Sequence, residues 1–224
     1  MRQSLVLLRH GESELNAKGA LVGRSDPQLT AHGREQALHA AAALASELAG
    51  VERLRLLSSP LRRARDTAEI VGAELAAHRH EIGVEIDDRL VEIDYGTYDG
   101  LRPDELPRDV WSAWRDDPGF RPPGGETLIE LQSRCSELYD ELRTKALAAG
   151  PRGAEVVVAV CHVSPIKAAV SWALGTGPEI AWRLNLAIAS ITRLSLGPGR
   201  PALLSFGETA HLTRTDPAEG RVGL

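Results

Sequence analysis

The feature that most constrains this sequence is a pair of apolar runs, 4–9 and 155–161, that each end abruptly in polar residues. Their letters, SLVLLR and EVVVAVC, show no alternation of apolar and polar positions, which is typical of strands buried on both faces of a sheet. Since such strands occur mainly in parallel sheets covered by helices, the two runs predict an α/β fold. A weaker run at 53–58, RLRLLS, is a candidate for a third strand.

Helical patterns separate these runs. Apolar residues recur at spacings of three and four in 61–75 and 128–142. The Ala-rich segment 30–49 begins at Thr30, a good N-cap, and Gly50 is expected to end it. Near the end of the chain, ITRLSL and PALLSF flank Gly-Pro-Gly, which predicts a hairpin at the sheet edge. We therefore predict a three-layer α/β/α sandwich whose mostly parallel, doubly wound sheet carries an edge hairpin near the C-terminus.

A single domain over 1–212 and a polar tail over 213–224 are expected. The chain has 224 residues, 43% of them hydrophobic, which is enough to bury a sizeable core. No internal repeat or low-complexity linker divides it. Segment 101–125 is rich in Pro, Gly and Trp and predicts an irregular excursion rather than a second domain.

Charge and hydropathy exclude several classes of partner. Lys and Arg total 26 against 31 Asp and Glu, so the net charge is −5 and no global basic field attracts nucleic acid or anionic lipid. No apolar run approaches the roughly 20 residues that span a bilayer, and the four apolar residues after Ser4 are too few for a signal-peptide core. We expect a cytoplasmic protein that binds neither nucleic acid nor membranes.

Basic residues follow the apolar runs where strands would end. Arg9 and His10 end the first run, and His162 follows the second, just before Ser164-Pro165, a plausible helix start. In an open α/β sheet, ligands bind beyond the carboxyl ends of the strands, and free N–H groups at a helix start favour anions. The candidate third strand is also followed by basic side chains, Arg62, Arg63 and Arg65. This convergence of His and Arg predicts a phosphate site.

The motifs, taken in order, resemble a known family. They are LRHGESELN, DPQLTAHGREQA, SSPLRRARDTA, LVEIDYGTYDG, PPGGETLIEL and VCHVSPIK. With these separations, from Leu5 to Lys167, the chain is similar to the histidine phosphatase superfamily, in its phosphoglycerate mutase-like branch. The acid phosphatase and phytase branch is disfavoured because Glu12 and Ser13, and not a further Arg and Pro, follow the Arg-His-Gly triplet.

The resemblance implies roles for individual residues. His10 would be the nucleophile that carries the phosphoryl group, and Arg9, Arg63 and His162 would bind the phosphate oxygens. Glu92 would donate a proton to the leaving alkoxide and then activate water. The phosphate pocket would be completed by neutral hydrogen bonds from two more residues, Asn16 and Ser13.

The residue types suit phosphoryl transfer without a metal or other cofactor. Charge in its loose transition state lies on the equatorial oxygens, where guanidinium and imidazole donors stabilise it. Flanking arginines disfavour protonation of His10, so the charges that bind phosphate also keep the nucleophile neutral. Because Glu92 must be protonated for the first step, we expect an acidic-to-neutral pH optimum.

Within the family the sequence favours a phosphatase acting on small phosphorylated metabolites. Only 33 residues separate Glu92 from Glu126, whereas the mutase resemblance would imply a long basic insertion there. The alternatives are phosphoglycerate mutase-type transfer and a non-catalytic phosphate-binding relative; the latter stays open because Val163 stands where many members have Gly. A homodimer is plausible from the resemblance alone. For the two tryptophans of the excursion, spaced i, i+3, the sequence favours covering the core over walling the substrate pocket. Five residues of the excursion are candidate specificity determinants: Arg102, Arg115, Arg121, Trp111 and Trp114.

Overall fold

Within the residues that the computed structural model describes, 4–77, 82–150 and 153–212, the strands form one six-stranded sheet. Its order is β3-β2-β4-β1-β5-β6. The neighbours β3, β2, β4 and β1 run parallel, while β5 is antiparallel to β1 and β6 is antiparallel to β5. The strands are β1 Ser4–Arg9, β2 Leu54–Ser58, β3 Val84–Ile86, β4 Val156–Cys161, β5 Ile191–Ser195 and β6 Ala202–Glu208.

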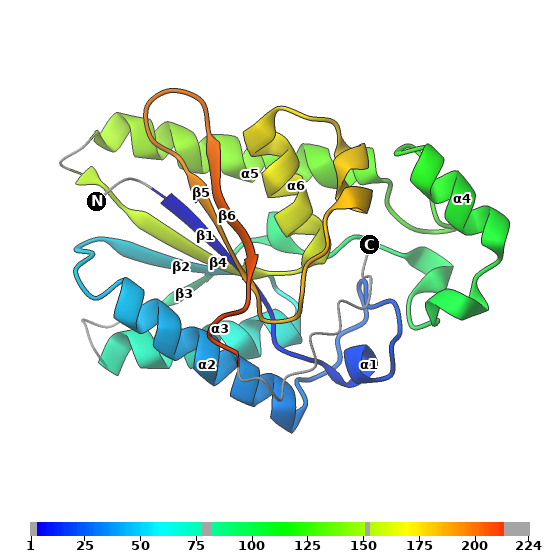
Figure 1. Ribbon diagram of the computed structural model, residues 1–224, viewed down its shortest axis with the longest axis horizontal. Coiled ribbons are helices and arrows are strands. Elements are labelled where there is room, and N and C mark those ends of the chain that lie inside the picture. The colour runs from blue at the N-terminus through cyan, green and yellow to red at the C-terminus, as the bar shows by residue number, and fades with distance from the viewer. Residues whose placement is uncertain (1–3, 78–81, 151–152, 213–224) are drawn as a thin grey trace.

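Helices cover both faces of this sheet (Figure 1). Helices α2 and α3 pack together on one face, and α5 and α6 pack together on the other. The helices are α1 Glu14–Ala17, α2 Ala31–Glu47, α3 Arg62–Ala77, α4 Arg108–Asp116, α5 Leu128–Ala149 and α6 Val163–Leu174. Short 3-10 turns are η1 Asp88–Leu90, η2 Gly96–Tyr98, η3 Pro103–Glu105 and η5 Pro178–Arg183. The predicted three-layer α/β/α class with a C-terminal edge hairpin is confirmed.

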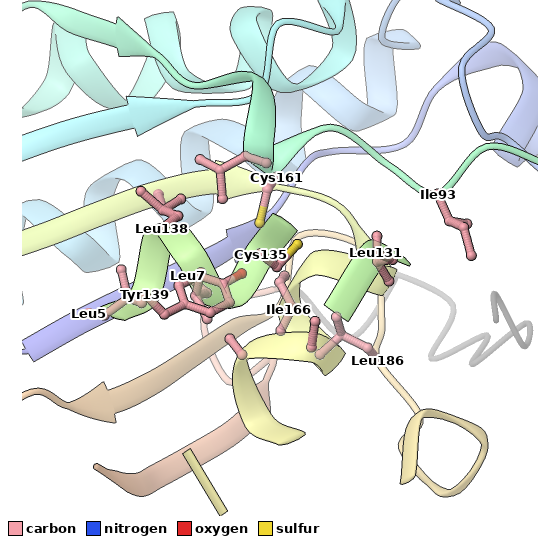
Figure 2. Close-up of a cluster of buried hydrophobic side chains, with 14 of the residues drawn as sticks. Leu5, Leu7, Ile93, Leu131, Cys135, Leu138, Tyr139, Cys161, Ile166 and Leu186 are labelled. Atoms are coloured by element: carbon pink, nitrogen blue, oxygen red, sulfur yellow. The ribbon is translucent and has the colours of Figure 1, made fainter. Parts of the chain in front are cut away.

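The unbroken apolar run of β1 reflects burial on both faces. Leu5 and Leu7 pack in the cluster that includes α5 and α6, which Figure 2 shows around Tyr139. Val6 and Leu8 alternate with them and pack in the cluster that includes α2 and α3. Burying a side chain of this size stabilises the fold by about 1.5–3 kcal/mol, so a polar residue on either face of β1 would be costly.

Parallel pairing brings the strand ends that carry polar residues to one edge of the sheet. In the register of β1 with β4, Arg9 lies opposite Cys161, and in that of β2 with β4, Ser58 lies opposite Val160. The residues after these strands are therefore neighbours. This places the starts of α3 and α6 beside the end of β1.

Two predicted helix boundaries are wrong. Helix α2 starts at its Thr30 N-cap as expected but ends at Glu47, with Leu48 as C-cap in place of the expected stop at Gly50. Leu48 is buried, so packing turns the chain before the glycine is reached. Helix α6 begins earlier than Ser164-Pro165, because His162 is its N-cap; Pro165 lies in the first turn, where its missing N–H is tolerated.

The excursion over 101–125 is more regular than expected. It contains η3 and α4, and Trp114 of α4 is fully buried, with its ring edge-on to Tyr95 at 5.7 Å between centroids. Trp111 stacks on Trp114 at 5.8 Å. The two tryptophans therefore cover the core, the first of the two interpretations left open by the sequence. The predicted tail over 213–224 lies outside the described residues.

The glycine of the Arg-His-Gly triplet is required by close backbone packing. A Cβ at Gly11 would collide with the carbonyl oxygen of Gly33 in α2, and a Cβ at Gly33 would collide with Glu12. The loop after β1 thus lies directly on the first turn of α2.

None of the helices in the described part of the chain is long and apolar enough to cross a membrane.

Candidate active site

Five charged or titratable side chains gather beyond the carboxyl ends of β1 and β4. Each is at most 6% exposed, which is unusual for residues of these types. They come from the end of β1, the first turn of α3, the loop after η1 and the N-cap of α6: Arg9, His10, Arg63, Glu92 and His162. The structure thus brings together five of the seven residues proposed from the sequence.

The hydrogen bonds of His10 define its tautomer. Its Nδ1 lies 2.7 Å from the carbonyl oxygen of Gly11, which can only accept, so Nδ1 carries the proton. The Nε–H of Arg63 donates to His10 Nε2 at 3.1 Å, so Nε2 holds a lone pair. Burial holds the pKa of His10 well below its usual value, and the charges of Arg63 and Arg9 lower it further. His10 is therefore a neutral imidazole with its free nitrogen facing a guanidinium.

His162 lies edge-on to His10, with 5.0 Å between ring centroids. Its Nε2 is 2.8 Å from the hydroxyl of Ser59. Burial is the largest cause that lowers the pKa of His162 well below its usual value, followed by the charge of Arg63. Both histidines of the site are thus neutral in the folded protein at neutral pH.

Two buried nitrogen atoms of the site have no partner among the described residues. Arg9 donates from Nη1 to the carbonyl of Leu186 at 2.6 Å, but its Nε is unpaired, as is Nδ1 of His162. An unpaired buried polar group costs about 1–3 kcal/mol. Burial lowers the pKa of Arg9 to about 10, so its guanidinium remains charged at neutral pH. A bound anion would accept from the Nε–H of Arg9, and also from Nδ1 of His162 in the tautomer in which Ser59 donates to Nε2 and the proton is on Nδ1.

Glu92 faces this cluster from the loop between η1 and η2. Its Oε1 accepts hydrogen bonds from the N–H of Ile93 at 2.8 Å and from the N–H of Ser164, in the first turn of α6, at 3.2 Å. Arg134 of α5 donates to the main-chain oxygen of Glu92 at 3.3 Å. The loop that carries this carboxylate is therefore fixed against both α5 and α6.

Ser13 and Asn16 bond to each other at the start of α1. Ser13 is the N-cap and accepts from the N–H of Asn16, while its own hydroxyl donates to Asn16 Oδ1 at 2.7 Å. The loop after β1 is thereby closed onto α1. Their contribution to a phosphate pocket stays a prediction.

The three arginines expected to set specificity lie on the surface. Two of them form ion pairs, and the third lines a hollow. Arg102 pairs with Asp104 at 2.8 Å, and Arg121 pairs with Glu130 at 2.5 Å. Arg115 lines a surface hollow together with Trp111. Their role in specificity also stays a prediction.

Sequence reasoning missed two residues of the site, Ser59 and Lys167. Ser59 stands in the Ser-Ser-Pro-Leu motif directly after β2, where its contact with His162 could be anticipated only from the parallel pairing. Lys167 is 2% exposed in α6, and burial lowers the pKa of its ammonium to about 8. The sequence signal that could have indicated Lys167 is a lysine within an otherwise apolar or small-residue helix.

Among the described residues, no group of three or more His, Cys, Asp or Glu could hold a metal ion.

The chain belongs to the histidine phosphatase superfamily (branch 1), whose family model matches residues 5–209. It spans about half (49%) of the length of curated mycobacterial relatives to which it is 36% identical over 191 residues, or 84% of this chain. The recognition of the family from its motifs is confirmed. Relatives named as phosphatases accord with the predicted enzyme class, phosphoric monoester hydrolase.

Other relatives carry the names of specific enzymes. The chain is 38% identical over 175 residues to glucosyl-3-phosphoglycerate phosphatase of Mycolicibacterium vanbaalenii, covering 76% of this chain and 74% of the relative. It is 34% identical over 203 residues to a 2,3-bisphosphoglycerate-dependent phosphoglycerate mutase of Thermoplasma acidophilum, covering 90% of each. A solved structure of mycobacterial glucosyl-3-phosphoglycerate phosphatase with VO3 superposes with a TM-score of 0.80 at 29% identity, covering 92% of this chain and all of that one.

The buried neutral histidines predict a loss of stability in mild acid. An unfolded histidine titrates near 6.5, whereas the pKa of His10 and of His162 is lowered in the folded state. Each therefore contributes stability that is present above about pH 6.5 and is lost as the pH falls below it, by up to about 1.4 kcal/mol per pH unit.

Urea unfolding in phosphate-free buffer between pH 6.5 and 5 measures this effect. We expect His10→Asn to remove the share of the slope that belongs to His10, while Leu38→Ala, at an exposed position of α2 outside the site, leaves the slope as in the wild type. Equal slopes for the wild type and His10→Asn would contradict a neutral buried His10.

Proposed function

We propose that this chain is a metal-independent phosphatase that hydrolyses small phosphomonoesters through a phosphohistidine intermediate on His10. The observation that carries the proposal is a neutral imidazole whose Nε2 lone pair faces the guanidinium of Arg63 at 3.1 Å. A nucleophile must be unprotonated, and the phosphoryl group it attacks needs positive charge around it. Nε2 of His10 is unprotonated and lies next to the positive charge of Arg63, so it meets both requirements.

In the first step, Nε2 of His10 attacks phosphorus and the bond to the ester oxygen breaks. Glu92 donates a proton to the departing alkoxide. Once the lone pair of Nε2 is bound to phosphorus, the Nε–H of Arg63 loses its acceptor and can donate to a phosphoryl oxygen instead. Arg9 Nε and His162 Nδ1, which have no partner in the described chain, are suited to the other oxygens.

In the second step, Glu92 accepts a proton from water as the water oxygen attacks phosphorus. The bond between Nε2 and phosphorus then breaks, inorganic phosphate leaves, and His10 returns to its neutral form. The same carboxyl group thus acts first as acid and then as base. Its position beside Ser164 at the start of α6 keeps it close to the histidine pair.

The chain between Glu92 and Glu126 favours hydrolysis over mutase transfer. It is short, and α4 packs on the core there through Trp114. The relative named glucosyl-3-phosphoglycerate phosphatase supports a substrate in which a phosphoryl group is attached to a small organic acid or its sugar derivative. The relative named a mutase keeps phosphoglycerate isomerisation as the second candidate. A single domain over 1–212, a cytoplasmic location and a homodimer remain predictions.

Phosphate release in the presence of EDTA tests the proposal. The substrates are p-nitrophenyl phosphate and a panel of sugar, glycerate and nucleotide phosphomonoesters that includes glucosyl-3-phosphoglycerate. We expect EDTA-resistant release, with one class of ester preferred. Release that EDTA abolishes, or isomerisation of phosphoglycerate without hydrolysis, would overturn the proposal.

A further inference from the structure

The guanidinium of Arg63 is held by main-chain carbonyls of segment 22–25. Its Nη1 donates to the carbonyl of Ser25 at 2.8 Å, and its Nη2 donates to those of Gly23 at 2.9 Å and Val22 at 3.3 Å. A guanidinium has five N–H donors in a fixed plane. Three carbonyls that accept from its Nη1 and Nη2 therefore determine the direction in which its Nε–H points, which is toward His10.

One carboxylate, that of Asp99, holds this segment in place. Its Oδ1 accepts from the N–H of Gly23 at 3.0 Å and from the hydroxyl of Ser25 at 2.5 Å, and its Oδ2 accepts from the N–H of Ser25 at 2.7 Å. The same two residues whose N–H groups bond to Asp99 thus present their carbonyls to Arg63. Donors face the carboxylate and acceptors face the guanidinium.

Packing leaves the segment little room to find other partners. A Cβ at Gly23 would lie 2.8 Å from the carbonyl oxygen of Ile93 and 2.9 Å from a ring carbon of Tyr95. The segment is therefore pressed against the loop that carries Glu92. Buried N–H groups that lose their acceptor in such a place are costly, so the segment would have to shift if Asp99 no longer accepted from it.

We propose that Asp99 is a positioning residue, whose carboxylate fixes segment 22–25 and through it aims the guanidinium of Arg63 at Nε2 of His10. The inference rests on the proposed function, since it assigns Arg63 to the reacting nitrogen. Asp99 lies 36 residues beyond Arg63 in sequence and bonds neither to it nor to His10 in the contacts described above. Its hydrogen bonds therefore reach Arg63 only through segment 22–25, while its negative charge also acts directly on the guanidinium.

The pKa of His10 is a readout that distinguishes positioning from a general structural role. Asp99→Asn keeps the size of the side chain but turns one acceptor into an NH2 group that faces an N–H. Removing a negative charge lowers a histidine pKa by itself, whereas moving Arg63 away from His10 raises it, because the charge of Arg63 is one of the causes that lower it. A rise is therefore the signature of lost positioning.

The experiment is an NMR titration of the His10 ring, together with kcat for the preferred ester. We expect Asp99→Asn to raise the pKa of His10 and to lower kcat about 10- to 100-fold. The matched control is Asp117→Asn. Its carboxylate likewise accepts from a main-chain N–H, that of Gly119 at 2.7 Å, but this hydrogen bond lies within 117–119 and outside segment 22–25. We expect this control to change neither quantity.

A second background tests whether Asp99 acts through Arg63. In a chain with Arg63→Gln, adding Asp99→Asn should not raise the pKa of His10 further, because no guanidinium remains to be aimed. If Asp99→Asn folds poorly by thermal melting, Ser25→Ala, which removes one of the three donors to Asp99, is expected to give a smaller rise in the same direction.

An unchanged or lowered pKa of His10 in Asp99→Asn, or an equal rise with and without Arg63, would overturn the proposal. The titration does not require turnover. Absence of EDTA-resistant hydrolysis in the wild type would thus refute the proposed function, while the titration still decides whether Asp99 positions Arg63.

Discussion

Replacing His10 by alanine is expected to lower kcat for phosphomonoester hydrolysis by about 10⁴-fold or more, the scale of loss when a covalent nucleophile is removed. The covalent route needs the Nε2 lone pair, and no other neutral nucleophile faces Arg63 in the contacts described. Phosphate binding should survive, because Arg9, Arg63 and His162 remain. The measurements are kcat for the preferred ester and the affinity for inorganic phosphate.

The phosphoenzyme gives a direct control for this variant. Wild-type protein mixed with ³²P-labelled ester and quenched in alkali should carry label that acid removes, as expected of an N–P bond, and His10→Ala should carry none. The matched variant His39→Ala, on α2 away from the site, should label and turn over as the wild type does. Turnover in His10→Ala within tenfold of the wild type would refute a phosphohistidine mechanism.

The part of the site that follows the parallel strands could be predicted from sequence. Arg9 ends β1 and His10 follows it, His162 follows β4, and Arg63 lies in the first turn of the helix after β2. The pairing of these strands alone therefore brings the four residues together. The apolar runs that predict the strands are long and unbroken, because both faces are buried. Local pattern and tertiary arrangement agree here.

The remaining parts depend on contacts between residues far apart in the sequence. Asp99 holds a segment more than 70 residues earlier, and Ser59 contacts His162 103 residues later. Neither of these contacts leaves a periodic pattern in the sequence from which it could be predicted. Strand β3 was also missed, since it has three residues and both Glu85 and Ile86 are exposed, and α4 was missed because Pro and Gly surround its nine residues.

Glu92 was placed from the family pattern, and its proposed role makes the second large prediction. Glu92→Gln should lower kcat by about 10²- to 10⁴-fold for alkyl phosphomonoesters, the usual contribution of a general acid. An alkoxide needs a proton in order to leave, and glutamine cannot supply one. Nitrophenolate is a stable anion and leaves without a proton, so p-nitrophenyl phosphate should phosphorylate His10 in this variant almost as fast as in the wild type.

The role of Glu92 as acid in the first step and its role as base in the second step can then be measured separately. With p-nitrophenyl phosphate, Glu92→Gln should release a burst of nitrophenolate equal to the enzyme concentration and then turn over slowly, since the base that activates water is also missing. Phosphoenzyme should accumulate during the slow phase. The control Glu141→Gln, which alters a partly buried ion pair between Glu141 of α5 and Arg89 of η1, should show neither the burst nor the slow phase. A Glu92→Gln variant that loses the same factor on both classes of ester, without accumulated phosphoenzyme, would show that Glu92 shapes the site and transfers no proton.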